Sequence, residues 1–124
     1  MVSEAEYYRS ILDNLTGGLV SVDLEGMIVY INPTAGRILR LSKTGGLVGM
    51  RCGEALGDFP TLCEVINDTL QTHKTVHRAE ISILHGNVPM IIGYSTLQIK
   101  NPKSECLGIA IVFQDLTFVS RKKN

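Results

Sequence analysis

Hydrophobic positions along the chain fall into short blocks, and the first block has a helical period. Its apolar members recur every three or four residues over 3–15, as on one face of an amphipathic helix; they are Tyr8, Ile11, Leu12 and Leu15. Ser3, followed three residues later by Glu6, forms a capping-box pattern at the start of this helix. The pair Gly17–Gly18 ends it.

The next blocks predict a hairpin and a second helix. Residues 19–23 and 27–31 read as strands, and the glycine of Leu24-Glu25-Gly26 suits the tight turn between them. Asn32-Pro33 then opens a helix, because asparagine is a preferred N-cap and proline suits the first helical position. The buried side of that helix is expected to comprise Ala35, Ile38, Leu39 and Leu41.

A longer helix and three strands complete the pattern. Residues 60–72 have a helical stripe consisting of Leu62, Val65, Ile66 and Leu70. Turn residues then separate three strand-like runs, which cover 76–84, 88–99 and 106–115. Because strands and helices segregate along the chain, we expect an α+β fold with a five-stranded antiparallel sheet and helices packed on one face.

Two motifs resemble the PAS domain family. The hairpin 19–31 has an aspartate and a glycine at its turn and continues into Asn32-Pro33-Thr34-Ala35, as the opening of that family does. The run Ile111–Thr117 is similar to the family's last strand and to its Asp-hydrophobic-Thr exit, here with Asp115 and Thr117. The resemblance implies a cavity between sheet and helices, and a role in sensing a ligand or relaying a signal.

Strand alternation and the resemblance together assign one set of side chains to that cavity. The set is Val20, Val22, Ile31, Ala35, Leu39, Leu62, Val65, Ile66, Ile81, Ile83, Ile91, Gly93, Ser95, Ile109, Ile111 and Phe113. Gly93 is of interest because a glycine in mid-strand often marks the close approach of a ligand or of backbone. The alternative is that the whole set is close-packed core.

The opposite face of the sheet is expected to carry a second apolar surface, formed by Met90, Ile92, Tyr94 and Val112. An apolar sheet face that stays exposed marks an interaction surface. We expect the N-terminal helix to cover it, either within one chain or across a homodimer through Tyr8, Ile11, Leu12 and Leu15. Both arrangements remain open at this point.

Composition narrows the classes of partner. In the 124 residues, 12 Lys and Arg balance 12 Asp and Glu, so we expect no nucleic-acid partner for this domain. The absence of a long apolar run and of an export signal predicts a cytoplasmic protein without a membrane partner. The cysteines Cys52, Cys63 and Cys106 lack C-x-x-C spacing, and His73 and His77 lack a third ligand, so no metal site is predicted.

The residues also argue against the cofactors that some PAS domains bind. The segment Met50-Arg51-Cys52-Gly53 lacks the cysteine motif of the flavin-binding members, and His73 lies too late in its helix to offer haem a ligand. No cofactor is therefore predicted, and an unidentified small molecule remains open as the ligand.

These observations predict a non-catalytic sensor module in three parts. Residues 1–16 form a dimerisation or capping helix, 17–118 the PAS domain, and 119–124 the start of a linker to an output domain. The resemblance implies that Asp115 and Thr117 pass the signal on, and favours a two-component sensor histidine kinase as the parent protein. Three alternatives are the input domain of a transcription activator, a ligand-free dimerisation module, and a small enzyme with a converging Cys–His pair.

Overall fold

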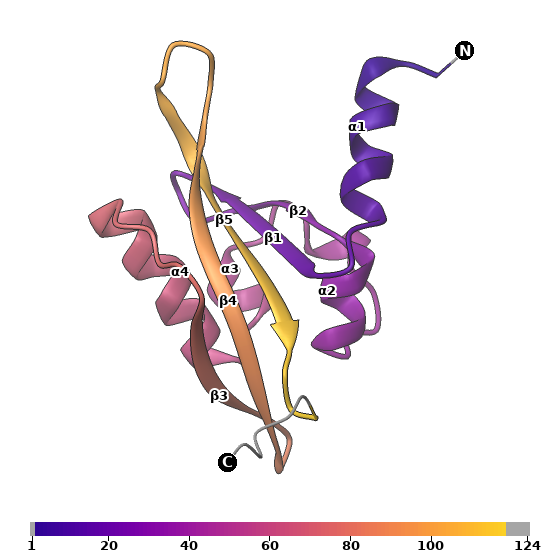
Figure 1. Ribbon diagram of the computed structural model, residues 1–124, viewed down its shortest axis with the longest axis vertical. Helices are drawn as coiled ribbons and strands as arrows, with labels where there is room; N and C mark the ends of the chain where they lie inside the picture. The colour runs from indigo at the N-terminus through magenta and orange to yellow at the C-terminus, as the bar shows by residue number, and fades with distance from the viewer. Residues whose placement is uncertain (1, 119–124) are drawn as a thin grey trace.

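A five-stranded antiparallel sheet forms the framework of the computed structural model, which describes residues 2–118 (Figure 1). The strands are β1 (Gly18–Asp23), β2 (Ile28–Ile31), β3 (Ala79–His85), β4 (Val88–Lys100) and β5 (Cys106–Asp115). They lie in the order β2-β1-β5-β4-β3, so the first and last strands meet at the centre of the sheet. The predicted α+β architecture is confirmed.

The helices lie almost entirely on one side of this sheet. They are α1 (Glu4–Asp13), α2 (Pro33–Ile38), the 3-10 turn η1 (Gly45–Leu47), α3 (Cys52–Ala55) and α4 (Pro60–Thr72). Figure 1 shows α2, α3 and α4 behind the sheet, whereas α1 projects away from it. Two predicted caps are confirmed, since Ser3 Oγ accepts a hydrogen bond from the amide of Glu6 and Asn32 Oδ1 accepts one from the amide of Ala35.

The hydrophobic core lies between the sheet and α2, α3 and α4. Most of the predicted interior set is buried there, namely Val20, Val22, Ile31, Ala35, Leu39, Leu62, Ile66, Ile83, Ile109, Ile111 and Phe113, with Val65 and Ile81 partly buried against them. These side chains pack against one another, together with others such as Ile28, Leu56 and Phe59 that the sequence reading left out. Their contact with a ligand stays a prediction.

The predicted orientation of β4 was wrong. Tyr94 pairs with Phe113 and Thr96 with Ile111, and directly opposed residues of an antiparallel pair share a face. Met90, Ile92 and Tyr94 therefore face the core rather than the outer surface. Conversely Ile91, Gly93 and Ser95 lie on the outer face, where Ser95 pairs with Val112.

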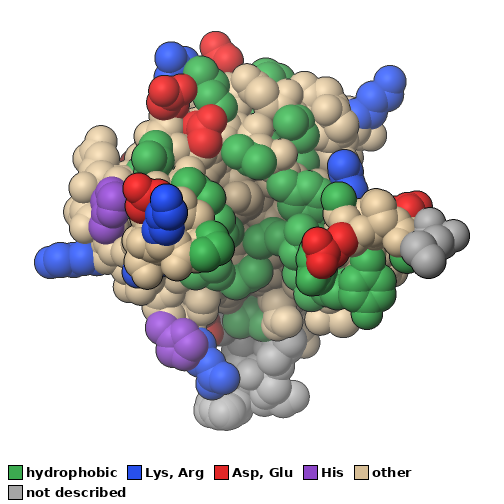
Figure 2. Space-filling view, turned by 90° about the horizontal axis from the view of Figure 1, so that it is seen from above, with side chains coloured by type: hydrophobic (Ala, Val, Ile, Leu, Met, Phe, Trp, Pro, Cys, Tyr) green, Lys and Arg blue, Asp and Glu red, His purple; other side chains and the backbone are tan. Residues whose placement is uncertain are grey.

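The N-terminal helix does not cover the outer face of its own chain. None of the residues of α1 is buried, and Tyr8, Ile11 and Leu15 remain 56%, 47% and 36% exposed. Figure 2 looks down on α1 and on the tip of the β4–β5 hairpin, and shows hydrophobic side chains in the hollow between them. Packing of α1 on the sheet within one chain is therefore not the arrangement in this structure.

Two further expectations concern a membrane-spanning helix and the linker after the domain. Among the helices of residues 2–118, none is long and apolar enough to cross a membrane. The predicted linker, 119–124, lies outside the described residues.

Candidate functional site

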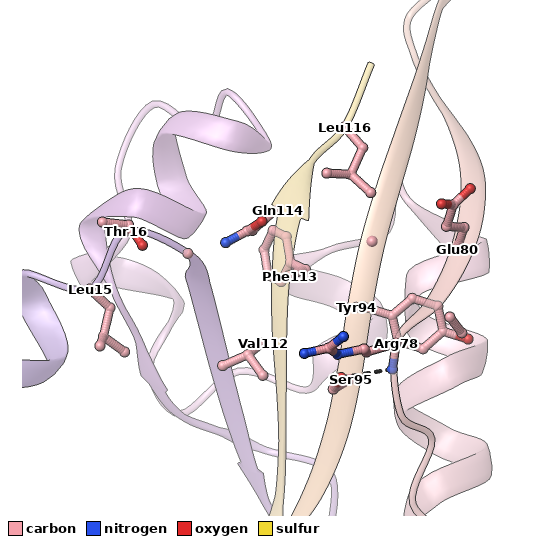
Figure 3. Close-up of a pocket in the computed structure, with 13 residues that line it drawn as sticks. Leu15, Thr16, Arg78, Glu80, Tyr94, Ser95, Val112, Phe113, Gln114 and Leu116 are labelled. Atoms are coloured by element: carbon pink, nitrogen blue, oxygen red, sulfur yellow. Dashed lines mark hydrogen bonds between the residues drawn. The ribbon is translucent and has the colours of Figure 1, made fainter. Parts of the chain in front are cut away.

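A groove of about 480 Å³ lies on the outer face of the sheet (Figure 3). The chain enters the domain beside it, after α1, and leaves the domain beside it, after β5. Its lining comprises Leu15, Thr16, Gly17, Arg78, Ala79, Glu80, Gly93, Tyr94, Ser95, Val112, Phe113, Gln114 and Leu116. Leu15 and Thr16 bound it on the α1 side, and Arg78 and Glu80 bound it on the β3 side (Figure 3). The groove is thus mainly apolar, with one residue of each charge at its rim.

One residue of β4 that lines this groove, Gly93, has no side chain, and Leu116 uses the space this leaves. Leu116 lies over Gly93, as Figure 3 shows for the Leu116 side chain beside β4. A β-carbon at residue 93 would lie 2.6 Å from Leu116 Cδ1, which is closer than real contacts allow. Nearby, Arg78 adopts a left-handed φ of 55°, and its amide donates to Ser95 Oγ over 2.9 Å.

The predicted exit residues form a hydrogen-bonded turn that is attached to β4. Asp115 Oδ1 accepts from both the amide of Thr117, at 2.9 Å, and its hydroxyl, at 2.5 Å. Thr117 Oγ1 in turn accepts from the amide of Ile91, and the amide of Leu116 donates to the Ile91 carbonyl over 2.7 Å. The exit therefore continues the pairing with β4 beyond the end of β5.

One asparagine joins α1 to the core. Asn32 is fully buried, and its Oδ1 accepts hydrogen bonds from the amides of Leu19 and Ala35. Its Nδ2 donates to the carbonyls of Leu12 and Gly17. The sequence predicted the cap on α2 but missed the second half of this network, because nothing local marks an asparagine as a bridge to a preceding helix.

A tyrosine on β2 makes a second attachment to α1. The Tyr30 hydroxyl donates to Asp13 Oδ1, and the Arg9 guanidinium lies 5.7 Å from the centre of the Tyr30 ring, within cation–π range. Burial, the hydrogen bond to Asp13 and the negative charge of Asp13 raise the pKa of Tyr30 to about 12, and Arg9 opposes this shift. The neutral phenol is the form that holds the helix.

The histidines occupy places that the sequence only partly anticipated. His73 ends α4 in a left-handed conformation with φ 59°, and its carbonyl accepts from Gln98 Nε2. His85 stacks near Phe59, with ring centres 5.8 Å apart, beside a second hollow of about 640 Å³ between the start of α4 and the β3–β4 hairpin. Within residues 2–118, no group of three His, Cys, Asp or Glu side chains is placed to hold a metal.

The comparisons with known proteins agree with this architecture. The family model described as PAS domain matches residues 6–75, which is more than half of the chain. The chain belongs to the PAS domain family. It is thus a sensory module without catalytic activity of its own, as the sequence predicted.

The relatives of this PAS domain are signalling proteins. The chain is 30% identical over 108 residues to the signal transduction histidine-protein kinase AtoS of Escherichia coli K12. That match covers 86% of this chain but 17% of the kinase, so the chain corresponds to a small part of such a protein.

Solved structures show the same fold at low identity. The PAS domain of BvgS from Bordetella pertussis superposes with a TM-score of 0.73 at 16% identity, covering 97% of this chain and 90% of that one. A PAS domain from Colwellia psychrerythraea gives 0.66 at 18% identity, covering 93% and 98%. The Vibrio cholerae VqmA dimer gives 0.71 at 16% identity, covering 94% and 52%.

Proposed function

We propose that this PAS domain is the input module of a sensor histidine kinase and works as a homodimer in the cytoplasm. The observation that carries the proposal is the shared groove at the entry and exit of the domain. Leu15 and Thr16 follow α1, Leu116 belongs to the exit, and all three line the same hollow. A change in the packing of α1 would therefore reach the exit directly, without passing through the core.

The apolar stripe of α1 is the proposed dimer contact. Tyr8, Ile11 and Leu15 are exposed and Leu12 is half-buried, so residues 2–118 leave most of this stripe uncovered. The outer face of a second copy presents a groove whose lining is chiefly apolar, which suits such a stripe. We therefore assign the groove to the partner's helix, in a two-fold symmetric arrangement.

Sedimentation equilibrium of the chain tests this contact. We expect the unaltered chain to be a dimer and Ile11→Glu to be a monomer, because a buried unpaired carboxylate would oppose association. Val48→Glu is the matched control, since Val48 is also exposed, at 49%, but follows η1 on the helical side. A monomeric unaltered chain, or dimers of equal strength in both variants, would exclude the α1 contact.

The output domain is the second part of the proposal. We assign residues 1–16 to the dimerisation helix, 17–118 to the PAS domain and 119–124 to the linker. The identity to AtoS supports a kinase. The similarity of fold to VqmA, whose dimer is described in the absence of its target DNA, favours a transcription regulator as the second candidate. Incubating the full-length gene product with ATP separates them, because only a kinase becomes phosphorylated on histidine.

A small ligand in the interior remains part of the proposal. Most of the side chains predicted to line the cavity pack against one another, so a ligand must open space between α4 and the sheet. A ligand that binds the folded state alone raises the unfolding temperature, and the rise grows with the logarithm of its concentration once that exceeds the dissociation constant. The test is the unfolding temperature of the domain measured with fractions of a metabolite extract. A higher unfolding temperature with one fraction supports ligand sensing, whereas an unchanged unfolding temperature with every fraction favours a ligand-free relay module.

A further inference from the structure

Two cysteine thiols meet in the helical layer, away from the groove and the exit. Cys52 is the first residue of α3, and Cys63 lies in the first turn of α4. Their sulfur atoms are 4.0 Å apart, and both residues are buried, with 3% and 8% of their surface exposed. A disulfide requires the sulfurs to approach to about 2.05 Å, so a shift of about 2 Å closes the bond.

The hydrogen bonds around the pair distinguish the two sulfurs. The Cys52 thiol donates to Cys63 Sγ, while the Cys63 thiol has the Leu56 carbonyl as an acceptor at 3.3 Å. The hydrogen bond from Cys52 lowers the pKa of Cys63, against the effect of burial, and the same bond raises the pKa of Cys52. Of the two sulfurs, Cys63 is therefore the one at which the thiolate form is favoured.

The start of α4 adds to this asymmetry. A helix N-terminus carries partial positive charge, which favours a thiolate in its first turn. α4 is 13 residues long, and its N-cap, Phe59, provides no side-chain acceptor for the free amides. Cys63 is also the more exposed of the two residues, which favours it as the first point of attack for a small oxidant.

We propose that Cys52 and Cys63 form a redox pair that hydrogen peroxide converts to a disulfide, with Cys63 as the attacking thiolate and Cys52 as the resolving thiol. In the first step Cys63 Sγ attacks a peroxide oxygen, the O–O bond breaks, and the sulfenic acid and one water form after a proton is taken up. In the second step Cys52 Sγ displaces water from that sulfenic acid and loses its proton. The two thiols lose two electrons, and peroxide is reduced to water.

The bond would join two parts of the fold that now touch without a covalent link. The amide of Cys52 donates to the Gly26 carbonyl over 2.9 Å, and Arg51 bridges to Met27, so α3 is attached to the β1–β2 turn. A disulfide to Cys63 would extend that attachment to the start of α4. Oxidation would therefore restrain the helical layer over the core, as an input separate from any ligand or dimer contact.

Peptide mapping of the unaltered chain tests the pair. The reduced folded protein is treated with hydrogen peroxide, unfolded, alkylated with N-ethylmaleimide and digested with trypsin. Cleavage after Arg51 and Lys74 places both thiols in the peptide 52–74, whereas Cys106 falls in 104–121. We expect peptide 52–74 to lose two hydrogens and both alkylation sites, reversibly with dithiothreitol, while Cys106 is still alkylated.

Single variants distinguish the two roles. In Cys52→Ala, Cys63 should accumulate as a sulfenic acid that dimedone traps, and in Cys63→Ala, Cys52 should stay reduced; Cys106→Ala should form the disulfide like the unaltered chain. Two results would overturn the proposal. One is a fully alkylated peptide 52–74 under conditions that oxidise Cys106, and the other is a disulfide that forms only after the chain is unfolded in urea.

Discussion

The side chain of Leu116 occupies the space above Gly93 that a β-carbon at residue 93 would need. Gly93 lies in the middle of β4, and Leu116 directly follows the end of the neighbouring strand β5. The contact is with the end of a flexible side chain, which can move without shifting backbone. Gly93 therefore leaves room for the Leu116 side chain on the outer face and does not contribute to filling the core.

This contact predicts a specific effect of Gly93→Ala. The methyl group should displace the Leu116 side chain, with a change in unfolding free energy within about 1 kcal/mol, because the core is not touched. Methyl chemical shifts and amide exchange at Leu116 would report the displacement. Ser82→Ala, at an exposed position of β3, is the control and should leave Leu116 unchanged. A strong loss of stability without movement of Leu116 would mean that Gly93 faces the interior.

A second prediction concerns the hydroxyl of Thr117. Thr117→Val keeps the shape but removes the acceptor of the Ile91 amide and the donor to Asp115, so stability should fall by about 1 kcal/mol. Hydrogen exchange at the Ile91 amide should become faster. Thr117→Ser retains the hydroxyl and should exchange as the unaltered chain does. Equal exchange in the valine and serine variants would show that this bond does not hold the exit on β4.

The local patterns of the sequence predicted most elements of the fold but not the facing of β4. The helix 60–72 and the strand 106–115 agree with α4 and β5 at both ends, because a proline start and flanking turns define them. In β4, by contrast, both alternating sets are largely apolar, so periodicity does not choose between them. Pairing of Tyr94 with Phe113 decides the facing, and that pairing is a long-range property.

The candidate site was predicted unevenly for the same reason. Asp115 and Thr117 were found because a motif of adjacent residues carries them, and the exposed stripe of α1 followed from helical spacing. The groove was missed, since it is assembled from α1, β3, β4, β5 and the exit. The Cys52–Cys63 contact was missed as well, because the thiols lie 11 positions apart along the chain, on two different helices.

A third prediction follows from the raised pKa of Tyr30. Folding raises that pKa from its ordinary value of 10.0 to about 12, chiefly through burial and the bond to Asp13, so the folded state favours the neutral phenol. This contribution to stability is complete below pH 10 and is lost as the pH rises toward 12. Unfolding of Tyr30→Phe should depend less on pH across that range than unfolding of the unaltered chain. Identical profiles would argue against the Tyr30–Asp13 contact.

The last prediction compares two of the polar attachments between the end of α1 and the core, those of Asn32 and Thr34. Asn32→Ala removes four hydrogen bonds and leaves the amides of Leu19 and Ala35 buried without that partner, so it should cost about 2–4 kcal/mol. Thr34→Ala removes one bond to the Leu15 carbonyl and should cost about 1 kcal/mol. Urea unfolding measures both costs, and amide exchange in α1 should rise further in the Asn32 variant, because Asn32 binds carbonyls on both sides of the helix end. A smaller cost for Asn32→Ala than for Thr34→Ala would show that α1 is held by other contacts.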